Sequence, residues 1–320
     1  MSARGWALFA AVSVIWGMPY LFIKLAVDEV SPGFVAWSRV TLGAAVLLPI
    51  AWKMGALQGL RARWRPLAAF AALEIVIPFT LIGFGEQHIS SSLTAILIAS
   101  LPLVVAFLAL RFDRSERPTP SRLFGMLVGL AGVVALVGID IGGHSDELLG
   151  AGAVLVATVG YAAGPLIVKR HLADVDPLGP VTAALGIAAV MLVPLAAASL
   201  PGTTPSTQAV ASIVVLGLVC SALAFILYFA LIAEVGPGRA TVITYVNPTV
   251  ALALGVAILG ESVTAGAITG LLLILAGSWL ATDGRLPPGL AAVTGRLFGS
   301  AGEAAPAQAR DPAAEAAGGP

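Results

Sequence analysis

Three ionisable side chains lie inside long apolar stretches of the sequence, where a charge is costly. Glu74 lies well inside the apolar run of roughly residues 66–86, and Lys24 and Arg39 lie in the two runs before it. An ionised carboxylate in hydrocarbon costs on the order of 3 kcal/mol or more, so such a residue is by default a candidate functional site. An acid that gains and loses a proton as its access alternates could couple proton movement to another process. Alternatively, Glu74 stays protonated and hydrogen-bonds to a neighbouring helix.

Lys24 and Arg39 lie toward the ends of their apolar runs. Each could bind the carboxylate of a small molecule or pair with an acid in a polar vestibule. The alternative is structural: the side chains reach the interface, or they pair with Asp28, Glu29 or Glu86.

Aromatic side chains in the apolar runs could line a cavity for a small molecule. They could also anchor helices at membrane interfaces. We expect cavity lining from Trp16 and Tyr161, and anchoring from Trp37 and Tyr228. The full aromatic set is Trp16, Tyr20, Trp37, Tyr161, Tyr228 and Tyr245.

Prolines inside the runs predict helix breaks, since each removes one backbone hydrogen bond and frees a carbonyl. The candidates are Pro78, Pro102 and Pro248. Ser100 near Pro102, and Asn247 beside Pro248, would gather with the freed carbonyls if the two helices face each other. The alternative is that each proline only kinks its helix for packing.

The composition places all these residues in a membrane protein. Of 320 residues, 58% are hydrophobic and only 11% are charged, whereas a typical soluble domain has about 25% charged residues. Such a chain could not cover a soluble surface with polar groups, and it has no basic face for nucleic acid. The single Cys220 excludes an internal disulfide and a cysteine-cluster metal site. We expect no cofactor and no metal.

Ten apolar runs are long enough for transmembrane helices, each needing roughly 20 residues. Of the 17 Lys and Arg residues, all except Lys24 and Arg39 fall on one side of the membrane if both termini are cytoplasmic. We therefore predict an all-α integral membrane protein with both termini inside. The runs are roughly 6–27, 34–52, 66–86, 91–111, 121–140, 148–168, 179–199, 210–233, 238–259 and 265–282.

The two halves of the chain match at a shift of about 145 residues. The matches include Lys24 with Lys169, Pro49 with Pro194, Glu116 with Glu261, and Gly125 with Gly270. Because each copy holds five helices, an odd number, the second copy must enter the membrane from the opposite side. This arrangement is typical of secondary transporters. We predict an inverted repeat of residues 1–143 and 144–284, followed by a disordered cytoplasmic tail, residues 285–320.

Several short motifs resemble one known family. They are Trp16-Gly17 followed by Lys24, Trp37-Ser38-Arg39, the segment 91–102, and the stretch 236–277 with Tyr245-Val246-Asn247-Pro248 and Gly260-Glu261. The chain resembles EamA-type members of the drug/metabolite transporter superfamily over about residues 6–282. It departs from the family at Arg114-Ser115-Glu116, where a Gly-Glu pair is usual. The resemblance implies ten helices in two repeats and the export of small metabolites, often amino acids or drug-like compounds, commonly coupled to protons.

We therefore predict a secondary transporter of the bacterial inner membrane that exports a small metabolite by alternating access. Its expected partners are the substrate, protons and the lipid bilayer. Glycines in runs 121–140 and 265–282 allow close packing of these two helices or a homodimer interface. A channel-like facilitator and a non-transporting scaffold or sensor are the alternatives. An enzyme is not expected, because the three histidines fall in loops without a HExxH motif.

Overall fold

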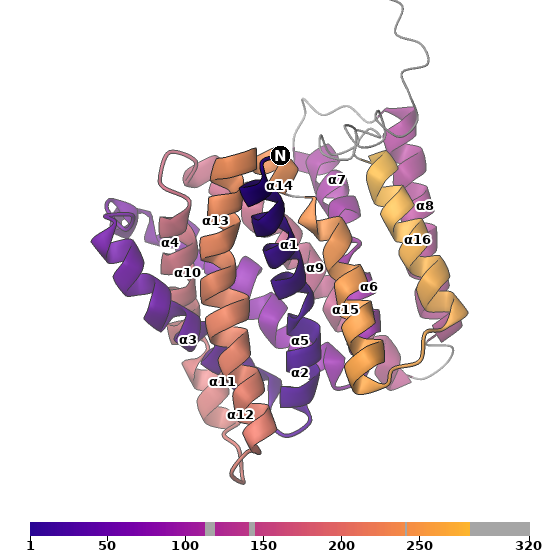
Figure 1. Ribbon diagram of the computed structural model, residues 1–320, viewed down its shortest axis with the longest axis horizontal. Coiled ribbons are helices and arrows are strands. Elements are labelled where there is room, and N and C mark those ends of the chain that lie inside the picture. The colour runs from indigo at the N-terminus through magenta and orange to yellow at the C-terminus, as the bar shows by residue number, and fades with distance from the viewer. Residues whose placement is uncertain (113–118, 141–144, 241, 282–320) are drawn as a thin grey trace, which may run out of the picture. The chain divides into compact units, whose positions relative to one another are not determined.

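A computed structural model describes residues 1–112, 119–140, 145–240 and 242–281. Within these ranges the chain forms helices and no strands, which confirms the all-helical prediction (Figure 1). Glu116 and the predicted tail, residues 285–320, lie outside the described residues.

In the described part of the first half, the chain forms ten helical elements. They are α1 (Ala3–Gly17), α2 (Pro19–Val27), α3 (Pro32–Lys53), η1 (Leu60–Arg63), α4 (Trp64–Ala71), η2 (Ala72–Val76), α5 (Ile77–Glu86), α6 (Ser91–Ile98), α7 (Leu101–Phe112) and α8 (Pro120–Asp140). The second half contains α9 (Ser145–His171), α10 (Leu178–Met191), α11 (Val193–Ala198), α12 (Thr207–Val214), η3 (Val215–Leu223), α13 (Ala224–Val235), α14 (Pro237–Ala240), α15 (Ile243–Leu259) and α16 (Ala265–Ala281).

Consecutive elements join into continuous apolar helices. Within the described residues, eight of these are long and apolar enough to cross a membrane. The predicted ninth and tenth runs form the shorter helices α15 and α16 of 17 residues each. At about 1.5 Å per residue such a helix extends about 25 Å, somewhat less than a bilayer core of roughly 30 Å. α15 begins later than predicted, because the positive φ of Gly236 ends α13 and residues 237–240 form a separate short helix.

Two of the spans contain π-helical turns, η2 and η3, at positions about 145 residues apart. In the first, the N–H of Ile77 bonds to the carbonyl of Ala72, five residues earlier. Pro78 follows and has no N–H to donate to the carbonyl of Glu74, so the α-helical pattern is already interrupted there. π-turns inside α-helices are frequent at functional sites.

Helices from the two halves pack against one another in matching pairs. α3 contacts α10, α6 contacts α15, and α8 contacts α16 (Figure 1). Glycines let α8 and α16 approach closely: Gly277 lies against the backbone of Gly129, and Gly270 lies against Leu136 and Gly132. As residue numbers rise along α8 they fall along α16, so the two helices run antiparallel. The predicted glycine faces therefore meet within one chain.

Polar side chains in loops tie one half to the other. The Glu261 carboxylate accepts hydrogen bonds from the backbone N–H groups of Ser91 at 2.8 Å and Ser92 at 3.0 Å, which caps the N-terminus of α6. The hydroxyl of Ser92 also donates to Glu261. Glu29 accepts bonds from the N–H and hydroxyl of Ser206 at 2.7 and 2.5 Å, just before α12. These contacts fix where the membrane helices begin relative to one another.

Candidate transport site

The Glu74 carboxyl group lies on the π-turn η2 and faces α9. Its Oε2 atom is buried and has no hydrogen-bond partner among the described residues. A Cβ atom added to Gly164 would collide with that oxygen, so the carboxyl group lies directly against the backbone of α9. The alternative in which Glu74 hydrogen-bonds to a neighbouring helix is therefore not realised for Oε2 in the described part of the chain.

Two tyrosines lie near Arg39, and one of them, Tyr161, is also near Glu74. Tyr161 on α9 lies close enough to both Arg39 and Glu74 for their charges to act on its hydroxyl group. Tyr20 on α2 interacts with Arg39 and with Glu86. The structure thus brings Tyr20, Arg39, Glu74 and Tyr161, all predicted site residues, into one polar cluster inside the helical bundle.

Arg39 lies within α3 and is 7% exposed. Its Nε donates to the hydroxyl of Ser221 on η3 at 3.0 Å, and its guanidinium lies 3.9 Å from the centre of the Phe79 ring. Of the described residues, no carboxylate lies within ion-pair distance of Arg39. A buried cation held by a ring face and a hydroxyl is thus available to an anionic group.

Lys24 and Glu86 do not form the ion pair that was one of the alternatives for Lys24. The ammonium group of Lys24 donates to the backbone carbonyls of Glu86 at 2.5 Å and Ile89 at 3.4 Å, not to a carboxylate. Glu86 was expected in an outer loop, but it is the last residue of α5 and is 0% exposed. Neither oxygen of its carboxyl group has a hydrogen-bond partner within the described ranges. The alternative in which Lys24 and Arg39 pair with Asp28, Glu29 or Glu86 is not seen among the described residues.

The ring of Trp16 belongs to an aromatic cluster. Its ring lies 4.7 Å from the ring of Tyr228 and meets Phe225 edge-on at 5.8 Å, so α1 packs on α13 through aromatic contacts. Tyr228, expected near an interface, also interacts electrostatically with Glu74. The aromatic cluster thus continues the polar cluster toward α1.

The three predicted helix breaks have different outcomes. Pro102 follows an interruption between α6 and α7, where the hydroxyl of Ser100 donates to the carbonyl of Leu97 at 2.6 Å. Pro78 marks the change from η2 to α5. Pro248 does not break its helix, since α15 runs continuously through it.

Asn247 helps to explain why α15 stays intact. With its amide nitrogen facing two carbonyl oxygens, it donates to Ile243 at 2.9 Å and to Ser13 at 3.0 Å. One bond lies within α15 and the other reaches α1, so Asn247 joins these two helices. Tyr245 lies half-buried near the start of α15.

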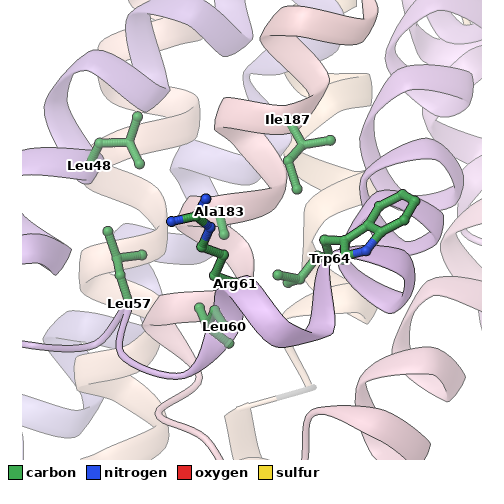
Figure 2. Close-up of a pocket in the computed structure, with 8 residues that line it drawn as sticks. Leu48, Leu57, Leu60, Arg61, Trp64, Ala183 and Ile187 are labelled. Atoms are coloured by element: carbon green, nitrogen blue, oxygen red, sulfur yellow. The ribbon is translucent and has the colours of Figure 1, made fainter.

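Two contributors to the polar cluster were missed from the sequence. Ser221 was not singled out, although it is one of few polar residues in the run of roughly 210–233. The burial of Glu86 was also missed, because its position at the end of an apolar run reads as the start of a loop. A mapped cavity of about 270 Å³ lies elsewhere, between α3, η1, α4 and α10 (Figure 2).

The sequence of the chain matches a known protein family. A sequence model of the EamA-like transporter family matches residues 3–138 and, again, residues 148–282. Together the two matches cover most of the chain. The chain belongs to the EamA-like transporter family.

Named relatives agree with this membership. The chain is 30% identical over 282 residues to a "probable terminal-alkyne amino-acid exporter" of Streptantibioticus cattleyicolor, covering 88% of this chain and 93% of the relative. It is 28% identical over 270 residues to the uncharacterized inner membrane transporter YedA of Escherichia coli K12, and the match covers 81% of this chain and 83% of that relative. A solved protein structure matches with a TM-score of 0.63 at 18% identity, covering 89% of this chain and 100% of its own, and shows a shared fold.

For an EamA-like transporter, the polar cluster is the natural candidate site. It contains a buried acid whose Oε2 has no partner in the described residues, a buried arginine without a carboxylate partner in the same residues, and Tyr161, which lies near both. Ionisable groups inside a membrane bundle mark substrate and ion pathways by default.

Proposed function

We propose that this EamA-like transporter exports a small metabolite across the bacterial inner membrane by alternating access, with Glu74 carrying the coupling proton. The single observation that carries the proposal is the buried Oε2 of Glu74, which lies on a π-turn without a hydrogen-bond partner in the described residues. A carboxyl group in this position gains no stabilisation from a fixed donor, so its protonation responds to access from either side of the membrane.

We infer that the chain is an inverted repeat with both termini in the cytoplasm, an arrangement that suits alternating access. The two π-turns lie about 145 residues apart, and so do the equivalent glycines of the antiparallel helices α8 and α16. Glu29 and Asp174, also 145 residues apart, each contact the start of a span in the opposite half. The two stretches matched by the family model support repeats at residues 1–143 and 144–284.

Amino acids are the substrate class that we propose to test first. The support is the relative named as a terminal-alkyne amino-acid exporter, together with Arg39, whose guanidinium has no carboxylate partner in the described chain. In this proposal Arg39 binds the substrate carboxylate, and Tyr20, Tyr161 and Trp16 line the route. Lys24 holds the end of α5 through backbone carbonyls.

Transport by purified protein in liposomes tests the proposal. A panel of amino acids, including one with a terminal alkyne, is loaded and its release is followed with and without an imposed pH gradient. We expect saturable release that the gradient accelerates, and counterflow of labelled substrate. The Glu74→Gln variant should retain counterflow but lose the response to the gradient. Glu29→Gln, an acid in a loop, is the matched control and should retain the response.

The alternatives predict other outcomes. A channel-like facilitator would conduct without saturation or counterflow. A scaffold or sensor would show no flux of any substrate in the panel. Flux through Glu74→Gln that still follows the gradient as in the parent protein would refute the role of Glu74 while leaving the transporter assignment intact.

A further inference from the structure

An open apolar groove lies outside the candidate transport site, between α3, η1, α4 and α10. It encloses about 270 Å³, and its walls include Leu48, Leu57, Leu67 and Ile187 (Figure 2). Pockets for drug-sized ligands usually hold about 300–1,000 Å³, so this groove is small for a complete transport substrate. Its apolar lining and small volume suit a segment of hydrocarbon chain.

One charged side chain, Arg61, belongs to the lining of the groove. Figure 2 shows its guanidinium extending from η1 across the groove, between Leu57 and Ala183. Within the described ranges no carboxylate lies within ion-pair distance of Arg61, and no hydrogen bond joins it to another residue. Two residues further on, Arg63 is bonded to both oxygens of Asp174. Of these two arginines in the same turn, Arg63 is neutralised by a carboxylate, whereas Arg61 has no carboxylate partner among the described residues.

The surroundings of the groove have the features of a membrane interface. Trp52 is 75% exposed and Trp64 is 60% exposed, and the basic residues Lys53 and Arg65 lie beside them in the chain. Tryptophan and basic side chains gather where the hydrocarbon region meets the headgroups. The apolar lining of the groove is complementary to the acyl chain of a phospholipid. The guanidinium of Arg61, which has no ion-pair partner among the described residues, is complementary to its phosphate group.

We propose that this groove is a binding site for an anionic phospholipid, with one acyl chain along the apolar walls and the phosphate group on Arg61. The lipid comes from the cytoplasmic leaflet if the basic ends of the helices face the cytoplasm, as proposed above; binding itself does not depend on transport. The lipid would bridge α3 and α10, which come from the two halves of the chain.

Native mass spectrometry of the full chain tests the headgroup preference. Phosphatidylglycerol and phosphatidylcholine with identical acyl chains are added to the protein, and bound lipids are counted. We expect phosphatidylglycerol to bind more tightly than phosphatidylcholine. The Arg61→Gln variant should bind phosphatidylglycerol about fivefold more weakly than the parent protein does, as expected for one basic residue at a membrane surface. Arg65→Gln is the matched control: it removes the same charge from an exposed residue of the same segment that does not belong to the lining of the groove.

A photoreactive group on the acyl chain of phosphatidylglycerol tests the location. We expect cross-links in the segment 57–67 and near Ala183, and their loss in Ala183→Phe, which fills the groove. Melting curves of each variant check that it is folded. Equal losses in Arg61→Gln and Arg65→Gln, equal binding of the two lipids, or cross-links spread over all helices would each overturn the proposal. None of these results depends on whether Glu74 couples transport to protons.

Discussion

The carboxyl group of Glu74 lies directly against Gly164, so the third span meets the sixth at the buried acid. Any side chain at position 164 would occupy the space of the Glu74 Oε2 atom. The glycine therefore sets where the acid can lie, and Pro165 follows it immediately in α9. This contact leads to the first prediction.

Gly164→Ala should displace the Glu74 carboxyl group and reduce transport. Overpacking at such a contact costs about 1–3 kcal/mol of unfolding free energy, so the variant should still fold. Gly152→Ala in the same helix is the control, because a Cβ there meets nothing within 4 Å. Flux in liposomes and thermal unfolding in detergent are measured for both. Equal flux through the two variants would contradict the proposed importance of this contact.

Glu261→Ala should loosen the start of α6. The substitution leaves the backbone N–H groups of Ser91 and Ser92 without their acceptor, and loss of a helix cap costs about 1–2 kcal/mol. Glu261→Gln keeps one acceptor oxygen but loses the charge at the helix N-terminus, so it should be intermediate. Hydrogen exchange over residues 90–98 and the melting temperature report the effect. Unchanged exchange in Glu261→Ala would show that the cap is dispensable.

Gly277→Ala should separate α8 from α16. A Cβ at this position collides with the backbone of Gly129, and we expect a loss of about 1–3 kcal/mol in unfolding free energy. Gly138→Ala in α8 has open space and should unfold like the parent protein. If the glycine face instead served a homodimer, Gly277→Ala would change the mass measured by analytical ultracentrifugation and leave the monomer's stability unaltered.

The ion pair between Arg63 and Asp174 should make stability depend on acid pH. Hydrogen bonds from Arg63 lower the pKa of the exposed Asp174 carboxyl from 3.8 to about 2. Because the pKa is lower in the folded state, the pair's contribution is complete above about pH 4 and is lost as the pH falls toward 2. Melting temperatures of the parent protein and Asp174→Asn should therefore differ at pH 6 and converge near pH 2. A constant difference across this range would contradict the assignment.

Much of the architecture could be predicted from sequence because spanning a bilayer requires long apolar helices. Within the described residues the ten predicted runs fall on helices, eight of them long and apolar enough to cross a membrane. Glu74 and Arg39 were identified because a charge inside such a run is conspicuous. Which side of each helix packs against a neighbouring helix could not be predicted in the same way. A helix that is apolar on all sides has no stripe that indicates which side meets a neighbour. For this reason the contact of Glu74 with Gly164 and the partner of Arg39 were found only in the structure.

The sequence by itself determined the class of protein, the long apolar helices and the family, because hydrophobic length and short motifs are local properties of the chain. The tertiary structure decided which polar groups meet. It placed Lys24 on backbone carbonyls, buried Glu86 at the end of α5, and kept α15 continuous through Pro248. These outcomes depend on which donor or acceptor from a distant helix reaches a buried group. Since such groups are stabilised by contacts far away in the chain, no local pattern specifies them.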